Sequence, residues 1–145
     1  MIQADILKPL AVLAMWTMVM WVWMYATRIP AINKLPKPTE PGADQGWTGA
    51  MLEGLIPREI QWKAHNYNHL HEAPTVFYAV ALALAMIGAG DGTNATIAWA
   101  YVAIRIVHSI YQATINKVMP RFVLFSLSSL CLIALCLHLL IAVFH

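Results

Sequence analysis

The sequence is short of charged residues and of cysteine, and each shortage excludes a class of protein. Charged residues make up 11% of its 145 residues, about half the usual share in soluble domains, so we do not expect a water-soluble globule. The net charge of +2 is too weak to predict a nucleic-acid partner. Cys131 and Cys136 lie five residues apart in an apolar run, which fits neither a redox pair nor a disulfide framework. We expect both to be small core residues.

Apolar residues, by contrast, make up 60% of the chain. A helix needs roughly 20 consecutive apolar residues to cross a bilayer, and four stretches approach this length. They predict an all-α integral membrane protein, a four-helix transmembrane bundle forming one domain over residues 1–145. The expected helices cover about 6–28, 58–88, 94–116 and 119–144, with a polar loop over about 29–57. Pro74 predicts a kink in the second helix, because proline has no backbone N–H to donate.

Lys and Arg gather at one end of the predicted bundle, in or beside the 29–57 loop and the connection between the third and fourth helices. This set comprises Arg28, Lys34, Lys37, Arg58, Lys63, Lys117 and Arg121, whereas the opposite end carries Lys8. Positively charged loops stay in the cytoplasm. We therefore expect both connections to be cytoplasmic and both termini to lie on the other side of the membrane.

Polar side chains interrupt the second and third apolar stretches. Placing an ionisable side chain inside the membrane costs free energy unless the side chain is paired or faces water. On the second helix they recur at spacings of three and four, which places them on one face; they are His65, Asn68, His69 and Glu72. The third helix repeats the pattern with Arg105, His108, Ser109, Gln112 and Asn116. Glu72 and Arg105 fall at similar depths in antiparallel helices, which predicts an ion pair between them.

Nearer the loop-rich end, cations and hydrogen-bond donors are expected to converge from three helices. They are Lys63, His65, Asn68, His108, Gln112, Lys117 and Arg121. A site with this composition at the end of the bundle suits a small anionic ligand. Two plainer interpretations stay open. Lys63 and Lys117 are also typical of solvated helix ends with snorkelling side chains, and a Glu72–Arg105 pair can serve helix packing alone.

A metal site is a further alternative. His65, His69 and Glu72 have the ligand types and the spacing of a zinc or non-haem iron site. Among the other histidines, His108 is well placed, whereas His138 lies towards the opposite end of the bundle. At most one mononuclear site is expected, and we assign no metal ligand on this pattern.

Two blocks of sequence carry a resemblance to a known family. They are WKAHNYNHLHEAPTVFY over residues 62–78 and AWAYVAIRIVHS over residues 98–109, the second continuing through Asn116 to Arg121 and Phe122. The chain resembles the membrane-associated proteins in eicosanoid and glutathione metabolism, the MAPEG family, and in particular its bacterial branch. The resemblance implies a homotrimer of left-handed four-helix bundles. Taken with the distribution of Lys and Arg, it leads us to expect a bacterial inner-membrane protein with periplasmic termini. It also implies that glutathione binds between subunits on the cytoplasmic side and reacts with lipophilic substrates from the bilayer.

The resemblance and the polar convergence together give a predicted site. Arg121 matches the family's arginine that stabilises the glutathione thiolate, so it is the predicted catalytic residue. The predicted glutathione-binding residues are Arg28, Lys63, His65, Asn68, Glu72, Arg105, His108, Gln112 and Lys117. The sequence departs from the family's pattern at Lys63, where relatives have an arginine, and at Gln112 and Phe125, where they have tyrosines.

The resemblance, carried by these residues, implies a glutathione-dependent transferase or peroxidase acting on a lipophilic electrophile. Its expected partners are two further copies of the chain, membrane lipids, a small anionic thiol and a lipophilic substrate. Gln112 and Phe125 favour an alternative, a non-catalytic scaffold or lipid-binding subunit that keeps the family's bundle, because each lacks the tyrosine hydroxyl. The metal-dependent oxidoreductase is the third hypothesis.

Overall fold

The computed structural model describes residues 4–37, 39–42 and 45–145, and this part of the chain forms helices and no strand. The α-helices are α1 (Leu7–Asn33), α2 (Arg58–His69), α3 (Ala73–Met86), α4 (Thr93–Thr114) and α5 (Val118–Phe144), and a short 3-10 helix, η1, covers Ala50–Leu52. The all-α architecture expected from the apolar stretches is therefore what the chain adopts.

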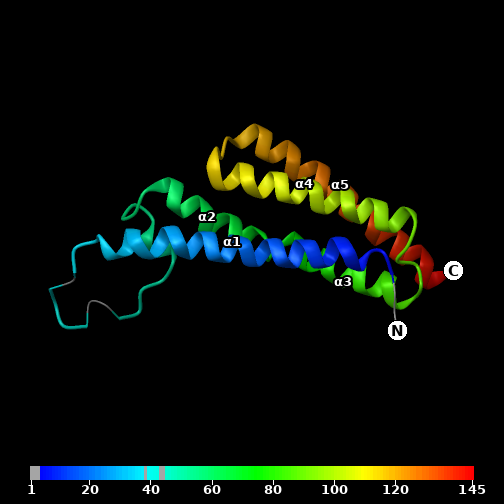
Figure 1. The fold of residues 1–145 in the computed structure, drawn as a ribbon, viewed down its shortest axis with the longest axis horizontal. Coiled ribbons are helices and arrows are strands. Elements are labelled where there is room, and N and C mark those ends of the chain that lie inside the picture. Colours follow the sequence, from blue (N-terminus) through cyan, green and yellow to red (C-terminus); the bar gives the residue numbers. More distant parts are fainter. Residues whose placement is uncertain (1–3, 38, 43–44) are drawn as a thin grey trace.

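The helices are arranged as four parallel or antiparallel rods (Figure 1). One rod is α1, a second consists of α2 followed by α3 along the side of α1, and α4 and α5 form a helical hairpin against them. Both termini lie at one end of the bundle, and the long connection after α1 lies at the other end (Figure 1). We call these the closed end and the open end, for reasons given below.

The second rod differs from the sequence prediction. A single kinked helix over 58–88 is wrong, because α2 ends at His69 and α3 begins at Ala73. Pro74 lies in the first turn of α3, where its missing N–H costs no helical hydrogen bond. The hydroxyl of Thr75 donates to the carbonyls of His71 and Glu72, which satisfies backbone acceptors at the break.

The other helices differ from their predicted bounds only at their ends. The largest difference is in α1, which continues to Asn33 through Pro30 although the prediction ended at residue 28. In the described part of the chain, α1 and α5 are the two helices long and apolar enough to cross a membrane. Most of their side chains are not buried within the single chain, so these surfaces are available to lipid or to other subunits.

The bundle interior is filled by one apolar cluster to which every rod contributes. Leu13 of α1, Phe77 of α3, Tyr101 of α4 and Leu135 of α5 are fully buried. The rings of Phe77 and Tyr101 stack with their centroids 4.6 Å apart. The two cysteines are free thiols that pack, partly buried, against this cluster.

At the closed end the chain segments are joined by hydrogen bonds and by a very close contact. The N–H of Ile6 donates to the carbonyl of Gly90 at 2.9 Å, and the N–H of Asp5 donates to Asp91 Oδ1 at 2.6 Å. A Cβ atom on Gly90 would lie 2.8 Å from Ile6 Cγ2, so only glycine fits there. The start of α1 is thus fixed tightly to the turn between α3 and α4.

Candidate functional site

A stripe of polar side chains on α4 faces the interior of the bundle. Arg105, His108, Ser109 and Gln112 recur at intervals of one helical turn, and each is at most 2% exposed. Side chains three and four positions apart lie on one helix face, which explains why the whole stripe points inward. Polar groups so deeply buried need partners, and those partners define the site.

Arg105 has fewer partners than its guanidinium can use. Its Nη2 donates to the backbone carbonyl of His69 at 3.0 Å, whereas its Nε and Nη1 are buried without an acceptor. Arg105 and Glu72, which both lie in the described part of the chain, do not form the predicted ion pair. The exposed Glu72 carboxylate instead lies 3.7 Å from His69 Nε2, because the helix that was to carry it inward ends at His69.

Aromatic rings surround this guanidinium. The rings of His69 and His108 stack with centroids 6.2 Å apart. The Cζ atom of Arg105 lies 5.7 Å from the centre of the Phe125 ring, a distance at which a cation is attracted to the ring face. Phe125 therefore contributes to the site through its ring.

Arg121 completes the group from the first turn of α5. Its Nη1 donates to Asn116 Oδ1 at 2.7 Å, and Asn116 adopts a positive φ of 54° in the turn between α4 and α5, a conformation that asparagine tolerates. Arg121 lies one turn before Phe125 on α5, and the Phe125 ring lies 6.4 Å from the His108 ring and 5.7 Å from Arg105 Cζ. We call His69, Arg105, His108 and Arg121 the basic cluster.

A second set of buried polar groups lies beside the basic cluster, and the sequence analysis missed part of it. Asn66 Nδ2 and Trp16 Nε1 both donate to the hydroxyl of Ser109, at 2.6 and 2.9 Å. Asn66 is 1% exposed, whereas Asn68, which we predicted to bind the ligand, is exposed. Asn66 is three residues before His69, so its place on the inward face was readable from the helical period.

The remaining predicted site residues are engaged elsewhere or lie at the surface. Lys63 Nζ donates to the carbonyls of Glu59 at 2.7 Å and Ala113 at 3.4 Å, which links α2 to α4. His65 is exposed, with Nε2 2.6 Å from Glu53 Oε1. Lys117 is also exposed. The chain thus brings Arg105, His108 and Arg121 together, with Gln112 buried on the same face of α4. The other predicted site residues lie outside this group.

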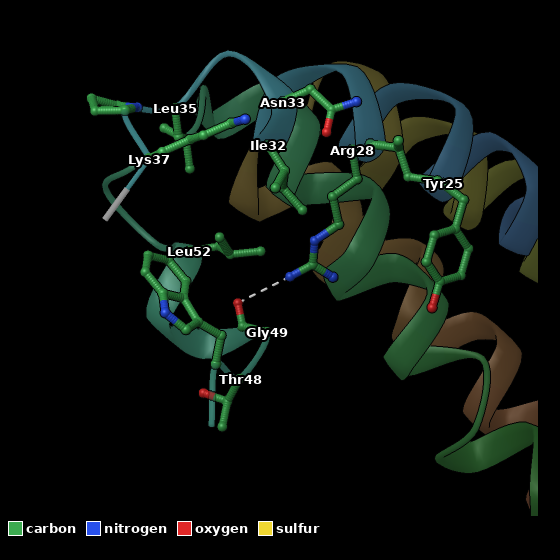
Figure 2. A pocket seen from close by; sticks show the side chains of 12 residues that line it. Tyr25, Arg28, Ile32, Asn33, Leu35, Lys37, Thr48, Gly49 and Leu52 are labelled. Carbon is green, nitrogen blue, oxygen red and sulfur yellow. Dashed lines mark hydrogen bonds between the residues drawn. The ribbon is translucent and has the colours of Figure 1, made fainter. Parts of the chain in front are cut away.

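Two pockets open at the open end of the bundle. A pocket of about 340 Å³ reaches Asn116, the residue that holds Arg121; it is lined by Glu53, Gly54, Ile56, Arg58, Gln61, Trp62, His65 and Asn116. A larger pocket of about 560 Å³ lies between the end of α1 and the connection after it, and Arg28 points into it (Figure 2). No described lining residue of the larger pocket belongs to the basic cluster.

The metal hypothesis finds no support in the geometry. Within residues 4–37, 39–42 and 45–145, no three His, Cys, Asp or Glu side chains are grouped so that they can hold a metal ion. His65, His69 and Glu72 were expected on one helix face, but Glu72 lies beyond the end of α2.

The chain matches the model of the MAPEG family over residues 6–141 and therefore belongs to this family. The family consists of membrane proteins and includes glutathione transferases, peroxidases and non-catalytic members. Together with the two long apolar helices, this makes the chain an integral membrane protein. No curated protein and no solved structure matches it.

Proposed function

We propose that this member of the MAPEG family binds glutathione, or a similar small anionic thiol, at the basic cluster and uses it against a lipophilic electrophile as a transferase or a peroxidase. The observation that carries the proposal is the guanidinium of Arg105, which has two buried N–H-bearing atoms without acceptors. A cation inside a membrane helix that lacks a counter-ion is costly, and it is typical of a functional site.

The unsatisfied groups of the cluster fit the chemistry of glutathione, which has two carboxylates, amide and ammonium donors and a thiol. Arg105 supplies buried donors for a carboxylate, and the buried Gln112 Oε1, which has no partner, is free to accept from an N–H. His69 and Arg121 are partly exposed, so they form the accessible side of the cluster. Donors and acceptor thus match both kinds of group in the ligand.

Arg121 is the proposed catalytic residue, since it stands at the accessible rim with its guanidinium held by Asn116. A fixed cation in a poorly solvated site favours thiolate over thiol. The thiol, when bound, supplies the sulfur nucleophile. Asn116 is then a positioning residue, because it fixes Arg121 from the turn that joins α4 to α5.

We further propose that the open end faces the cytoplasm of a bacterial cell, with the termini periplasmic and the protein in the inner membrane. The argument is the distribution of charge, because seven of the nine Lys and Arg residues lie at this end and positive loops stay inside. The resemblance of the sequence to bacterial members supports a homotrimer. Three subunits would give the exposed apolar faces of α1 and α5 protein partners.

Replacing Arg121 with alanine tests the function. We expect Arg121→Ala to lower glutathione-dependent turnover of an aryl halide or a lipid hydroperoxide by about 100-fold or more, the scale of losing one preorganised charge-stabilising group. The assay uses full-length protein in lipid nanodiscs, with circular dichroism to check folding. Lys34→Ala is the matched control, because Lys34 is an exposed cation at the same end that lines neither pocket. Equal turnover in Arg121→Ala and the native protein would overturn the assignment.

The second candidate is a non-catalytic subunit with the same bundle. Two observations favour it: Lys63 is already engaged with backbone carbonyls, and Gln112 and Phe125 lack the hydroxyls of tyrosine. Calorimetric titration of the native protein with glutathione, together with thiolate absorbance, separates the two candidates. Heat and a thiolate signal support the enzyme, and the absence of both supports the non-catalytic subunit.

A further inference from the structure

The larger pocket at the open end is a separate cavity of ligand size. Its volume of about 560 Å³ lies within the usual range for small-molecule sites, about 300–1,000 Å³. The last turns of α1 form one wall, and the opposite wall comes from the connection and from η1. The described lining residues are Tyr25, Arg28, Ile29, Ile32, Asn33, Leu35, Pro36, Lys37, Trp47, Thr48, Gly49 and Leu52.

The charge of the lining has one sign. Arg28 and Lys37 are its charged residues, and none of the described lining residues is acidic. Arg28 reaches across the pocket from α1 and donates from Nη2 to the carbonyl of Gly49 at 3.0 Å (Figure 2). Its Nε is buried and has no acceptor. The Arg28 guanidinium therefore keeps a donor without an acceptor at the wall of the pocket.

The rest of the lining is mostly apolar. Ile32 and Leu52 lie beside the Arg28 side chain (Figure 2), and Leu52 is 7% exposed. Ile29, by contrast, is 51% exposed on the outer surface of α1. An apolar path thus runs from the guanidinium to the outside of the helix, so the occupant needs an anionic group joined to an apolar chain.

The position of the pocket along α1 indicates where that occupant comes from. The uncharged run of α1 extends from Pro9 to Thr27 and ends next to Arg28, so Arg28 marks the level at which the hydrocarbon of the bilayer gives way to headgroups. Tyr25 and Trp47 line the same pocket, and these residue types are enriched at that level of a membrane. The pocket therefore faces lipid headgroups rather than the bilayer centre.

We propose that this pocket binds an anionic phospholipid of the surrounding leaflet, with the phosphate at Arg28 and Lys37 and an acyl chain along Ile29 and Ile32. Arginine suits phosphate because its planar fork can donate two parallel hydrogen bonds. A bound lipid would hold the connection against the end of α1. The proposal does not depend on glutathione chemistry, because the basic cluster contributes no described residue to the pocket.

The test measures lipid retention on the full-length, detergent-purified protein by native mass spectrometry. The probes are phosphatidylglycerol, phosphatidylcholine with the same acyl chains, oleate, glycerol phosphate and glutathione. We expect phosphatidylglycerol to bind the native protein more tightly than any other probe does at this pocket. We also expect Arg28→Gln to weaken its binding about tenfold or more, as the loss of a charge-assisted contact predicts. Arg58→Gln, which removes an exposed arginine at the same end, is the matched control and should bind normally.

A second variant keeps the charge and moves it. A Cβ on residue 49 would lie 3.1 Å from Arg28 Nη2, and the φ of −58° at Gly49 suits any residue. Gly49→Ala should therefore displace the guanidinium with little strain and weaken phosphatidylglycerol binding less than Arg28→Gln does. Circular dichroism confirms that both variants are folded.

Three results would overturn the proposal. The first is equal phosphatidylglycerol binding by Arg28→Gln and the native protein. The second is binding of oleate or glycerol phosphate as tight as that of phosphatidylglycerol, because a fatty acid or a free phosphate would then be the occupant. The third is loss of glutathione binding in Arg28→Gln with phosphatidylglycerol retained, which would place Arg28 in the thiol site. Failure of the Arg121 experiment leaves all these measurements unaffected.

Discussion

The two ends of the bundle are built differently. At the closed end, Gly90 fits against Ile6 with no space for a single added carbon, and Asn94 Oδ1 lies 2.5 Å from His138 Nδ1, which joins α4 to α5. At the open end two pockets separate the segments, and Arg28 retains an unused donor. Among the described residues, hydrogen bonds and a close glycine contact join the segments at the closed end, whereas pockets and an unused donor remain at the open end.

This difference separates the end that stabilises the bundle from the end that is available for binding. Inside a bilayer, helices gain little from hydrophobic burial, because lipid is as apolar as the side chains, so close packing and interhelical hydrogen bonds hold them together. The closed end supplies those contacts. Because the closed end holds the helices together, the open end can carry cations and cavities. These would weaken a bundle whose stability depended on that end.

The largest expected effect on stability is at the closed end. Gly90→Ala should lower the free energy of unfolding by about 1–3 kcal/mol, the usual cost of overpacking, because its Cβ would lie 2.8 Å from both Ala4 Cβ and Ile6 Cγ2 and 3.1 Å from the backbone Cα of Ala85. Denaturation in mixed detergent micelles measures the change. Gly49→Ala at the open end is the comparison and should change the free energy by less. If the two substitutions cost the same, the contrast between the ends is wrong.

The next effect concerns the middle of the bundle. Ser109→Ala removes the hydroxyl that accepts from both Asn66 and Trp16 and leaves the buried donor of Asn66 and the half-buried donor of Trp16 unpaired. We expect a loss of about 1–2 kcal/mol, at the modest end of the penalty for such groups, measured by the same denaturation. Ser129→Ala is the control, because the Ser129 hydroxyl donates only within its own helix, to the Phe125 carbonyl. A Ser109→Ala protein as stable as this control would show that the hydrogen bonds from Asn66 and Trp16 to Ser109 contribute nothing to the free energy of unfolding.

The smallest effect is expected at the open end. Glu53→Gln removes the carboxylate that contacts His65, and the side chains of Glu53 and His65 are 59% and 46% exposed. Exposed pairs contribute about 0–1 kcal/mol, so denaturation should detect little change, and raised salt should alter the native protein equally little. A loss as large as that in Gly90→Ala would mean that the open end also carries the stability of the fold.

The elements that follow from local composition could be predicted from the sequence. The uncharged runs of α1 and α5 and the polar stripe of α4 each predict a helix, and the spacing of Arg105 and His108 predicts that they share its inward face. These features depend on neighbours within one or two turns. They needed no knowledge of how the chain packs.

The break between α2 and α3 could not be predicted in the same way. The expected shared face of Asn68 and Glu72 assumed an unbroken helix, and it is lost because the chain leaves the helix after His69. The pocket around Arg28 also escaped prediction, because Gly49 reaches that arginine only through the fold of a connection without regular periodicity. Both errors arise where contacts between distant segments decide the conformation.

The break between α2 and α3 changes what the end of α2 offers to the interior of the bundle. The last residue of α2, His69, supplies the carbonyl to which Arg105 donates, while α3 stays anchored in the apolar interior through Phe77. In an unbroken helix the His69 carbonyl would accept from the N–H of Ala73, so the end of α2 leaves this carbonyl available to Arg105. The interruption of the helix thus supplies the buried guanidinium with a backbone partner where the sequence had suggested the Glu72 carboxylate.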